Sequence, residues 1–322
     1  MANYKVGDYI RLIRNANDMT QEELAFRAGV ATETISRIEN GKHKITKNVY
    51  RKIMSVFDYF PQQFYGICTD NDIEIMDIKQ AEEDAEVKFE YEAAREYLEI
   101  LRQKAGDTLV NRQYILRAEA VLDCRIGKID AKEMLERLKK ALSLTVADYE
   151  KFILCEEANM RVYPFTEMEA LIVLNIADAY GKLKEHEQDE RIKRMLLKCL
   201  QAGYTDGKNI DNLKLIIKRN LAKTLMRQKR YEEVLELLRQ VFIEAKIAGN
   251  GIILSLVLYE ISWTMRKLNE VNKEERYDVY DIKEKMRQAY YIAAARNDNY
   301  VYKIIKDVFM ECYNEEIEFS GE

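Results

Sequence analysis

Proline and histidine are almost absent from this sequence, and glycine is sparse. Its 322 residues include two prolines, two histidines and twelve glycines. A many-stranded β architecture needs frequent tight turns, which such a chain does not encode. Long helices joined by short turns are expected instead, so we predict an all-α fold.

Clustered metal ligands and long apolar runs are missing too. The histidines, His43 and His186, lie far apart, and the five cysteines are scattered without a CxxC pair. The longest apolar stretch, Gly251 to Ile261, is too short to cross a bilayer, and the start, MANYKVGDYIRLIR, lacks the apolar core of a signal peptide. We expect a cytoplasmic protein with reduced thiols, no membrane association, no metal and no cofactor.

Catalytic signatures are equally scarce. The sequence has no Gly-rich phosphate loop, no nucleophile elbow and no paired histidines. We therefore expect that the protein is not an enzyme.

The net charge of −5 is unevenly distributed along the chain. Residues 1–66 hold ten Lys and Arg against seven Asp and Glu, whereas residues 70–99 hold twelve acids against three bases. A basic head followed by an acidic body suits a protein that contacts phosphate with one domain only. We place the head at residues 1–67 and the body at 72–317.

The stretch from Met19 to Lys44 predicts two short helices joined by a tight turn. Thr20 and Glu23 have the spacing of a capping box, and Gly29 stands where the chain must turn sharply. The second helix is expected from about Ala31 to Glu39. With a helix before it (6–15) and two after it (48–57 and 62–65), the head is a bundle of about five helices.

This second helix has one apolar and one polar face. The polar face carries groups that can contact base edges in a major groove, namely Thr32, Glu33, Ser36 and Arg37. An arginine suits guanine and a carboxylate accepts from the cytosine amino group. Side chains around the two helices are placed to contact DNA phosphates, namely Arg14, Gln21, Asn40, Lys42 and Lys44.

The segment from Gln21 to Lys42 resembles the Xre/Cro/phage-repressor helix-turn-helix family. The resemblance rests on QEELA, then Gly29-Val30, then ISRIENGK from Ile35 onward. It implies that Thr32, Glu33 and Arg37 contact bases, that Gln21, Asn40 and Lys42 contact the backbone, and that Arg14 pairs with Glu39. One departure is Ala31, where the family often has a capping Ser or Thr.

The body shows long helical patterns with internal repetition. We expect helices at 78–105, 108–126, 130–145, 147–160, 166–184, 187–202, 209–229, 231–248, 251–269, 275–297 and 299–317. The segment around Asn175-Ile-Ala177 recurs around Asn220-Leu-Ala222, and Glu260 takes the asparagine's place in a third copy. The copies lie 45 and 40 residues apart. They favour tetratricopeptide-like hairpins stacked into a right-handed solenoid.

In such a stack the first helix of each hairpin lines a concave inner face. Asn175 and Asn220 are then expected at equivalent heights, where their amides can bind the backbone of an extended peptide. Equally, these asparagines can serve helix packing by bonding a neighbouring carbonyl. The expected peptide groove comprises Asn175, Arg219, Asn220, Tyr259 and Glu260.

The combination of such a head with such a body resembles the Rgg/PlcR-type quorum-sensing regulators of Gram-positive bacteria. The stretch FTEMEALIVLN from Phe165 also resembles that family. The resemblance implies a homodimer on an inverted-repeat operator in double-stranded DNA, with a short signalling peptide bound in each body. Two alternatives remain: a DNA-binding regulator whose body is a dimerisation or protein-interaction scaffold without a peptide ligand, and an adaptor whose head has lost DNA binding.

Overall fold

In the part of the chain that the structure describes, every regular element is a helix. The structure, a computed structural model, describes residues 17–42, 45, 47–57, 73–146, 149–150, 165–201 and 210–317, together with residues 7, 10, 11, 14 and 15. This confirms the predicted all-α fold. The expected helices at 62–65 and 147–160 lie outside the described residues, apart from 149–150, as does the join between head and body.

The head contains three complete described helices around a small core. They are α2 (Gln21–Ala28), α3 (Thr32–Glu39) and α4 (Lys47–Ser55). Leu24 of α2, Ile35 of α3 and Ile53 of α4 are fully buried against one another. Burial of these large apolar side chains fixes the orientation of α3 and leaves its opposite face outside the core.

The turn between α2 and α3 forms as its sequence predicts. Gly29 has a φ of 61°, a left-handed conformation that glycine adopts without penalty. The Thr20 hydroxyl accepts from the Glu23 amide at the start of α2. The reciprocal half of the expected capping box is replaced, because the Glu23 carboxylate accepts from Arg27 at 2.5 Å.

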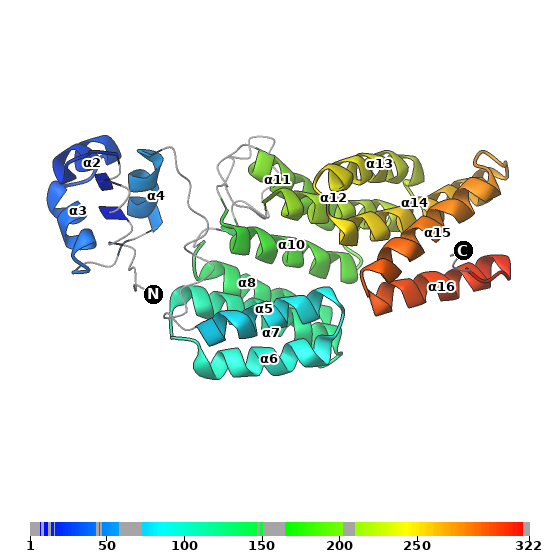
Figure 1. The fold of residues 1–322 in the computed structure, drawn as a ribbon, viewed down its shortest axis with the longest axis horizontal. Helices are drawn as coiled ribbons and strands as arrows, with labels where there is room; N and C mark the ends of the chain where they lie inside the picture. The colour runs from blue at the N-terminus through cyan, green and yellow to red at the C-terminus, as the bar shows by residue number, and fades with distance from the viewer. Residues whose placement is uncertain are drawn as a thin grey trace.

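The body is a series of helical hairpins that follow one another along the chain (Figure 1). The pairs are α5 (Ile73–Val87) with α6 (Tyr91–Lys104), α7 (Leu109–Arg125) with α8 (Ala131–Ser143), α10 (Glu167–Lys182) with α11 (His186–Gln201), α12 (Ile210–Arg227) with α13 (Tyr231–Ile247), and α14 (Gly251–Asn272) with α15 (Val279–Ala295); α16 (Asn299–Tyr313) follows. The first helices of successive hairpins, α7, α10, α12 and α14, also contact one another. Their side chains therefore form one continuous face.

One predicted helix is wrong. The segment 78–105 is not a single helix but belongs to two, α5 and α6, separated by Lys88, Phe89 and Glu90. Phe89 has a φ of 64°. A left-handed non-glycine residue carries a strain penalty that sequence propensities do not anticipate, and the stacking of the Phe89 ring on Tyr300 of α16 offsets it.

Helix α10 lies in the middle of the largest apolar cluster of the body. It begins with a complete capping box, in which the Thr166 hydroxyl accepts from the Glu169 amide and the Glu169 carboxylate accepts from the Thr166 amide. Ile172, Val173 and Ile176 are buried between neighbouring helices. Because α10 is packed on several sides, its middle stays partly exposed only along a narrow strip that contains Leu171, Asn175 and Asp178.

Candidate functional site

The outer face of α3 carries the predicted base-contacting side chains. Thr32, Glu33 and Arg37 are exposed and Ser36 is partly exposed. Arg37 donates to the Glu33 carboxylate at 2.6 Å, one helical turn away, and both side chains remain more than half exposed. An exposed pair of this kind contributes only a few tenths of a kcal/mol, so DNA can separate it at little cost.

The two ends of α3 differ, because only the C-terminal end has a side-chain hydrogen bond to the backbone, which the Asn40 side chain provides. Ala31 stands at the N-cap and provides no side-chain hydrogen bond, so the helix begins at Thr32, one residue later than expected. At the other end the Asn40 amide donates to the Ser36 carbonyl at 2.8 Å. Lys42 is exposed beyond the helix, and Lys44 lies outside the described residues.

Arg14 does not occupy the position expected of a phosphate contact. Its guanidinium donates to both oxygens of Glu39, at 2.7 and 2.9 Å, and to the Met19 carbonyl at 2.7 Å. The hydrogen bond to Glu39 raises the pKa of Arg14. Gln21 also donates to Glu39, at 2.7 Å. Both side chains are therefore committed to a nearly buried carboxylate that ties α3 to the rest of the head, and we assign Arg14 a structural role.

In the body, the predicted asparagines lie on the face formed by α7, α10, α12 and α14, which we call the first-helix face. The side-chain oxygen of Asn175, Oδ1, accepts a hydrogen bond from Arg117 of α7 at 2.9 Å. The buried Arg117 guanidinium also forms a two-pronged ion pair with Glu86 of α5, at 2.9 Å for each bond. Asn175 thus terminates a polar chain that joins three helices, in agreement with the packing alternative.

Asn220 has a different partner. Its amide donates to Asp178 of α10 at 3.2 Å, three residues beyond Asn175. Asn175 likewise bonds to the hairpin before its own, through Arg117 of α7. Each asparagine therefore bonds across to the first helix of the preceding hairpin.

In the third repeat, an ion pair links α12 to α14, as the asparagine hydrogen bonds link the earlier first helices. Arg219 donates to both oxygens of Glu260 on α14, at 3.1 and 2.5 Å, and both side chains are mostly buried. Tyr259 beside them is partly buried, and its burial raises the pKa of its hydroxyl. Four of the five predicted groove residues, Asn175, Arg219, Asn220 and Glu260, therefore act as cross-helix ties, whereas Tyr259 packs against the apolar cluster of α15 and α16.

A buried lysine joins this face to the interior. Lys193 of α11 is fully buried and contacts Asp189 at 2.6 Å and Asp178 at 2.8 Å. Thr224 of α12 accepts from Lys193 and donates to Asp189. Burial raises the pKa of Asp189, against the effect of the lysine. This cluster connects α10, α11 and α12, and Asp178 is its only member that also borders the first-helix face.

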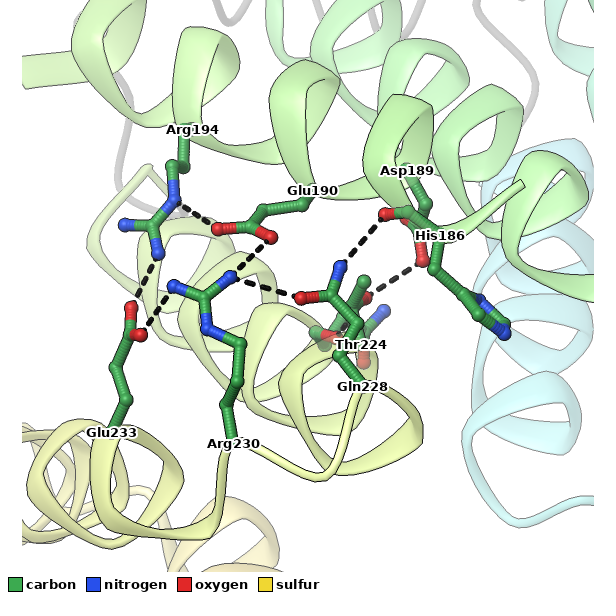
Figure 2. A network of polar contacts seen from close by, with 9 residues as sticks. His186, Asp189, Glu190, Arg194, Thr224, Gln228, Arg230 and Glu233 are labelled. Carbon is green, nitrogen blue, oxygen red and sulfur yellow. Dashed lines mark hydrogen bonds and ion pairs between the residues drawn. The ribbon is translucent and has the colours of Figure 1, made fainter. Parts of the chain in front are cut away.

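Figure 2 shows a second polar network at the turn end of the same hairpins. Arg194 and Arg230 each contact both Glu190 and Glu233, so two cations and two carboxylates alternate between α11 and the start of α13. A shallow depression beside it is lined by polar residues of the turns, including His186 and Gln228. The two arginines and two glutamates of the network neutralise one another, which is typical of a structural role.

Sequence reasoning missed Asp178 and Lys223, which stand three residues after Asn175 and Asn220. The repeat alignment contains the signal, because both positions fall one turn further along the same face. Lys193 was missed because its i,i+4 spacing from Asp189 is also that of an ordinary surface ion pair.

Among the described residues, no His, Cys, Asp or Glu side chains group in threes as metal ligands would. None of the described helices combines the length and apolar content needed to span a bilayer.

Residues 10–61 match the helix-turn-helix family. No curated protein sequence matches the chain. Among solved structures, Bacillus thuringiensis PlcR in complex with the peptide PapR7 and DNA is similar, with 18% identity, a TM-score of 0.63, and coverage of 94% of this chain and 99% of that one. PlcR in its apo form gives 18% identity, a TM-score of 0.54, and 95% and 99% coverage. A variant of the Streptococcus dysgalactiae SHP pheromone receptor Rgg2 gives 13% identity, a TM-score of 0.50, and 96% and 99% coverage.

These findings confirm the predicted helix-turn-helix resemblance and show that nearly the whole chain shares the fold of PlcR. Residues 10–61 therefore form a helix-turn-helix domain, the type of domain that places one helix in the major groove of DNA.

Proposed function

We propose that this protein is a DNA-binding transcription regulator, a homodimer that binds an inverted-repeat operator and is controlled by a short signalling peptide held on the first-helix face. The observation that carries the proposal is the similarity over nearly the full length of both chains to PlcR in complex with a peptide and DNA. A peptide that binds one arrangement of the body more tightly than another shifts the population between them, and so alters how the two heads meet DNA.

On the DNA side, α3 enters the major groove with its exposed face. Arg37 contacts guanine, Glu33 accepts from a cytosine amino group, and Thr32 and Ser36 contact thymine methyl groups or phosphates. Asn40 and Lys42 lie beyond the end of the helix, where they contact the phosphate backbone together with Lys44. Gln21 reaches phosphate only by exchanging its hydrogen bond to Glu39.

On the peptide side, Asn175, Asn220 and the polar groups beside them offer both donors and acceptors to a peptide backbone. Their present hydrogen bonds to Arg117 and Asp178 must then be exchanged for bonds to the peptide. That same observation favours the second candidate function, in which the first-helix face is a structural seam and the body is a dimerisation scaffold without a ligand.

Selection from random DNA duplexes tests the first half of the proposal. The wild-type chain should enrich one inverted-repeat sequence, and Arg37→Ala should weaken binding to it by on the order of 1–3 kcal/mol. Arg27→Ala is the matched control, because Arg27 forms the same i,i+4 pair with Glu23 on the neighbouring helix. Equal binding by wild type and Arg37→Ala contradicts the base-contact assignment.

Titration with short synthetic peptides encoded near the gene tests the second half. Wild type should bind one of them, and Asn220→Ala should bind it more weakly because one backbone contact is lost. Equal affinity of the two proteins argues against the asparagine contact. If none of the peptides binds, the scaffold function is favoured.

A further inference from the structure

Lys223 lies on α12, one helical turn beyond Asn220, and its charge is poorly balanced. Its side chain is 40% exposed, and the nearest carboxylate oxygen is Glu260 Oε1 at 3.8 Å. That oxygen already accepts from Arg219 at 2.5 Å. The lysine therefore has no carboxylate of its own within hydrogen-bonding distance among the described residues.

The two acids near Lys223 are engaged at all four oxygens. On Glu260, Arg219 donates to Oε1 and to Oε2. On Asp178, Oδ1 contacts the buried Lys193 at 2.8 Å and Oδ2 accepts from Asn220 at 3.2 Å. Neither acid can turn to Lys223 without breaking a tie that holds two helices together.

Two cations and two acids act on Lys223 electrostatically, and both acids are engaged by other partners. The groups that act on it electrostatically are Arg219 on its own helix, Glu260 on α14, and Asp178 and Arg125 on α10 and α7. Partial burial lowers the pKa of Lys223 to about 8, and the repulsion from Arg219 adds to this effect. A site that already disfavours its own positive charge is stabilised when an anion binds.

We propose that Lys223, with the positive potential of Arg219 and Arg125 behind it, forms the subsite for a carboxylate group of the signalling peptide. The inference rests on the proposed peptide-binding function and adds the chemical character of the ligand. The Asn220 amide one turn away suits a peptide backbone, and the ammonium group suits a carboxylate, so one extended peptide can satisfy both. The peptide is therefore acidic at the residue that meets Lys223, or ends there.

The proposal predicts how binding depends on pH. Bound carboxylate raises the pKa of Lys223, so the complex holds the proton more tightly than the free protein does. Affinity is then highest when Lys223 is charged and falls as the pH rises through about 8. Arginine keeps its charge at every accessible pH, so Lys223→Arg should bind without this dependence.

Retention of random-sequence heptapeptides on the immobilised full chain tests the proposal. The peptides are supplied in two forms, with free C-terminal carboxylates and with C-terminal amides. Wild type should enrich Asp or Glu at one position in both forms, or should retain only the free-acid form, and the comparison shows which carboxylate binds. Lys223→Met should lose the preference, with affinity for a preferred peptide lowered on the order of tenfold. Lys246→Met, a change at an exposed lysine of α13, should behave as wild type.

The outcomes separate the inference from the function on which it rests. If wild type and Lys223→Met retain the same peptides with the same acid content, the carboxylate subsite is wrong while peptide binding stands. If wild type retains no peptide at all, the peptide function fails and the subsite with it. For a retained acidic peptide, affinity should fall between pH 7 and 9.5 in wild type but not in Lys223→Arg. An equal fall in both proteins also overturns the assignment to Lys223.

Discussion

The exposed face of α3 and the first-helix face of the body are both rich in polar side chains, but these are bonded in opposite ways. On α3, Arg37 pairs with Glu33 of the same helix, and both remain largely in solvent. On the first-helix face, Arg219 pairs with Glu260 and Asn220 bonds to Asp178, so each bond joins two helices. The polar groups on α3 are accessible to a binding partner, whereas those on the first-helix face also stabilise the packing of one helix on another.

Because of this difference, a substitution on α3 and a substitution on the first-helix face report on different properties of the protein. Removing a side chain from the α3 face is expected to alter the proposed DNA contacts with little effect on stability, because exposed pairs contribute little. Removing one from the first-helix face leaves a partner on another helix without its bond, so stability and ligand affinity change together. Lys223 is the exception within the body, since it takes no part in a close cross-helix tie.

The largest effect is expected from Lys193→Met. Its removal leaves the buried Asp189 carboxylate with Arg227, at 3.8 Å, as its nearest cation, so the free energy of unfolding should fall by about 3–5 kcal/mol. Urea unfolding of the full chain measures this, with Lys246→Met as the control at an exposed site. The double variant Lys193→Met/Asp189→Leu should recover part of the loss. A loss below about 1 kcal/mol in the single variant contradicts the cross-helix role.

Arg14→Met tests whether the head contains one tie of the same kind as the body. Glu39 would keep only the hydrogen bond from Gln21, and local stability of the head should fall by about 3 kcal/mol. Hydrogen exchange of amides in residues 21–39 should become faster. Unchanged exchange combined with weaker operator binding would instead favour the phosphate contact expected from the sequence.

Glu82→Gln examines a buried polar group near the first-helix face. Glu82 of α5 is fully buried and accepts from Tyr114, and burial raises its pKa to about 7. Folding therefore favours its protonated form, and its contribution to stability is lost as the pH rises from about 4.5 through about 7. Unfolding at pH 5 and pH 8 should show that Glu82→Gln is about 2–3 kcal/mol more stable than wild type at pH 8 only. The same difference at both values argues against titration of Glu82.

The smallest effect is expected from Lys42→Ala. This exposed side chain contacts phosphate in the proposed complex, so its loss should weaken binding to all sequences by a similar factor. The slope of log affinity against log salt concentration should decrease in magnitude by about 1, without a change in sequence preference. An altered preference would mean that Lys42 contacts a base.

The sequence predicted those features that local chemistry controls. The boundaries of α3 follow from Gly29 and from Asn40-Gly41, and its buried side follows from Ile35 and Ile38. The repeat pattern also predicted that Asn175 and Asn220 stand in the first helices of two successive hairpins, and they lie in α10 and α12. Their hydrogen-bond partners, Arg117 and Asp178, could not be predicted. Which residue lies opposite each asparagine depends on the axial offset between neighbouring helices, and the repeat pattern alone does not determine that offset.

Two further features escaped sequence reasoning for physical reasons. The break between α5 and α6 contains neither glycine nor proline, so no local signal marks Phe89. The burial of Lys193 follows from the close approach of three helices. At Gly181 of α10, for instance, a Cβ atom would lie 2.6 Å from Asp189 Oδ2. Such short distances between helices depend on the three-dimensional packing and leave no local signal in the sequence.

The break at Phe89 also determines how the stack of hairpins begins. It folds α6 back on α5, so the first layer of the body is a complete hairpin instead of a projecting rod. Four acids of that hairpin, Asp77, Asp84, Glu92 and Glu96, are all exposed, and so are three large apolar side chains, Val87, Tyr97 and Ile100. A stack of repeats can grow by adding layers only where an apolar side is open. The four exposed carboxylates of this first hairpin repel a second copy of it, so their charge disfavours filament growth by the stacking of copies on this hairpin.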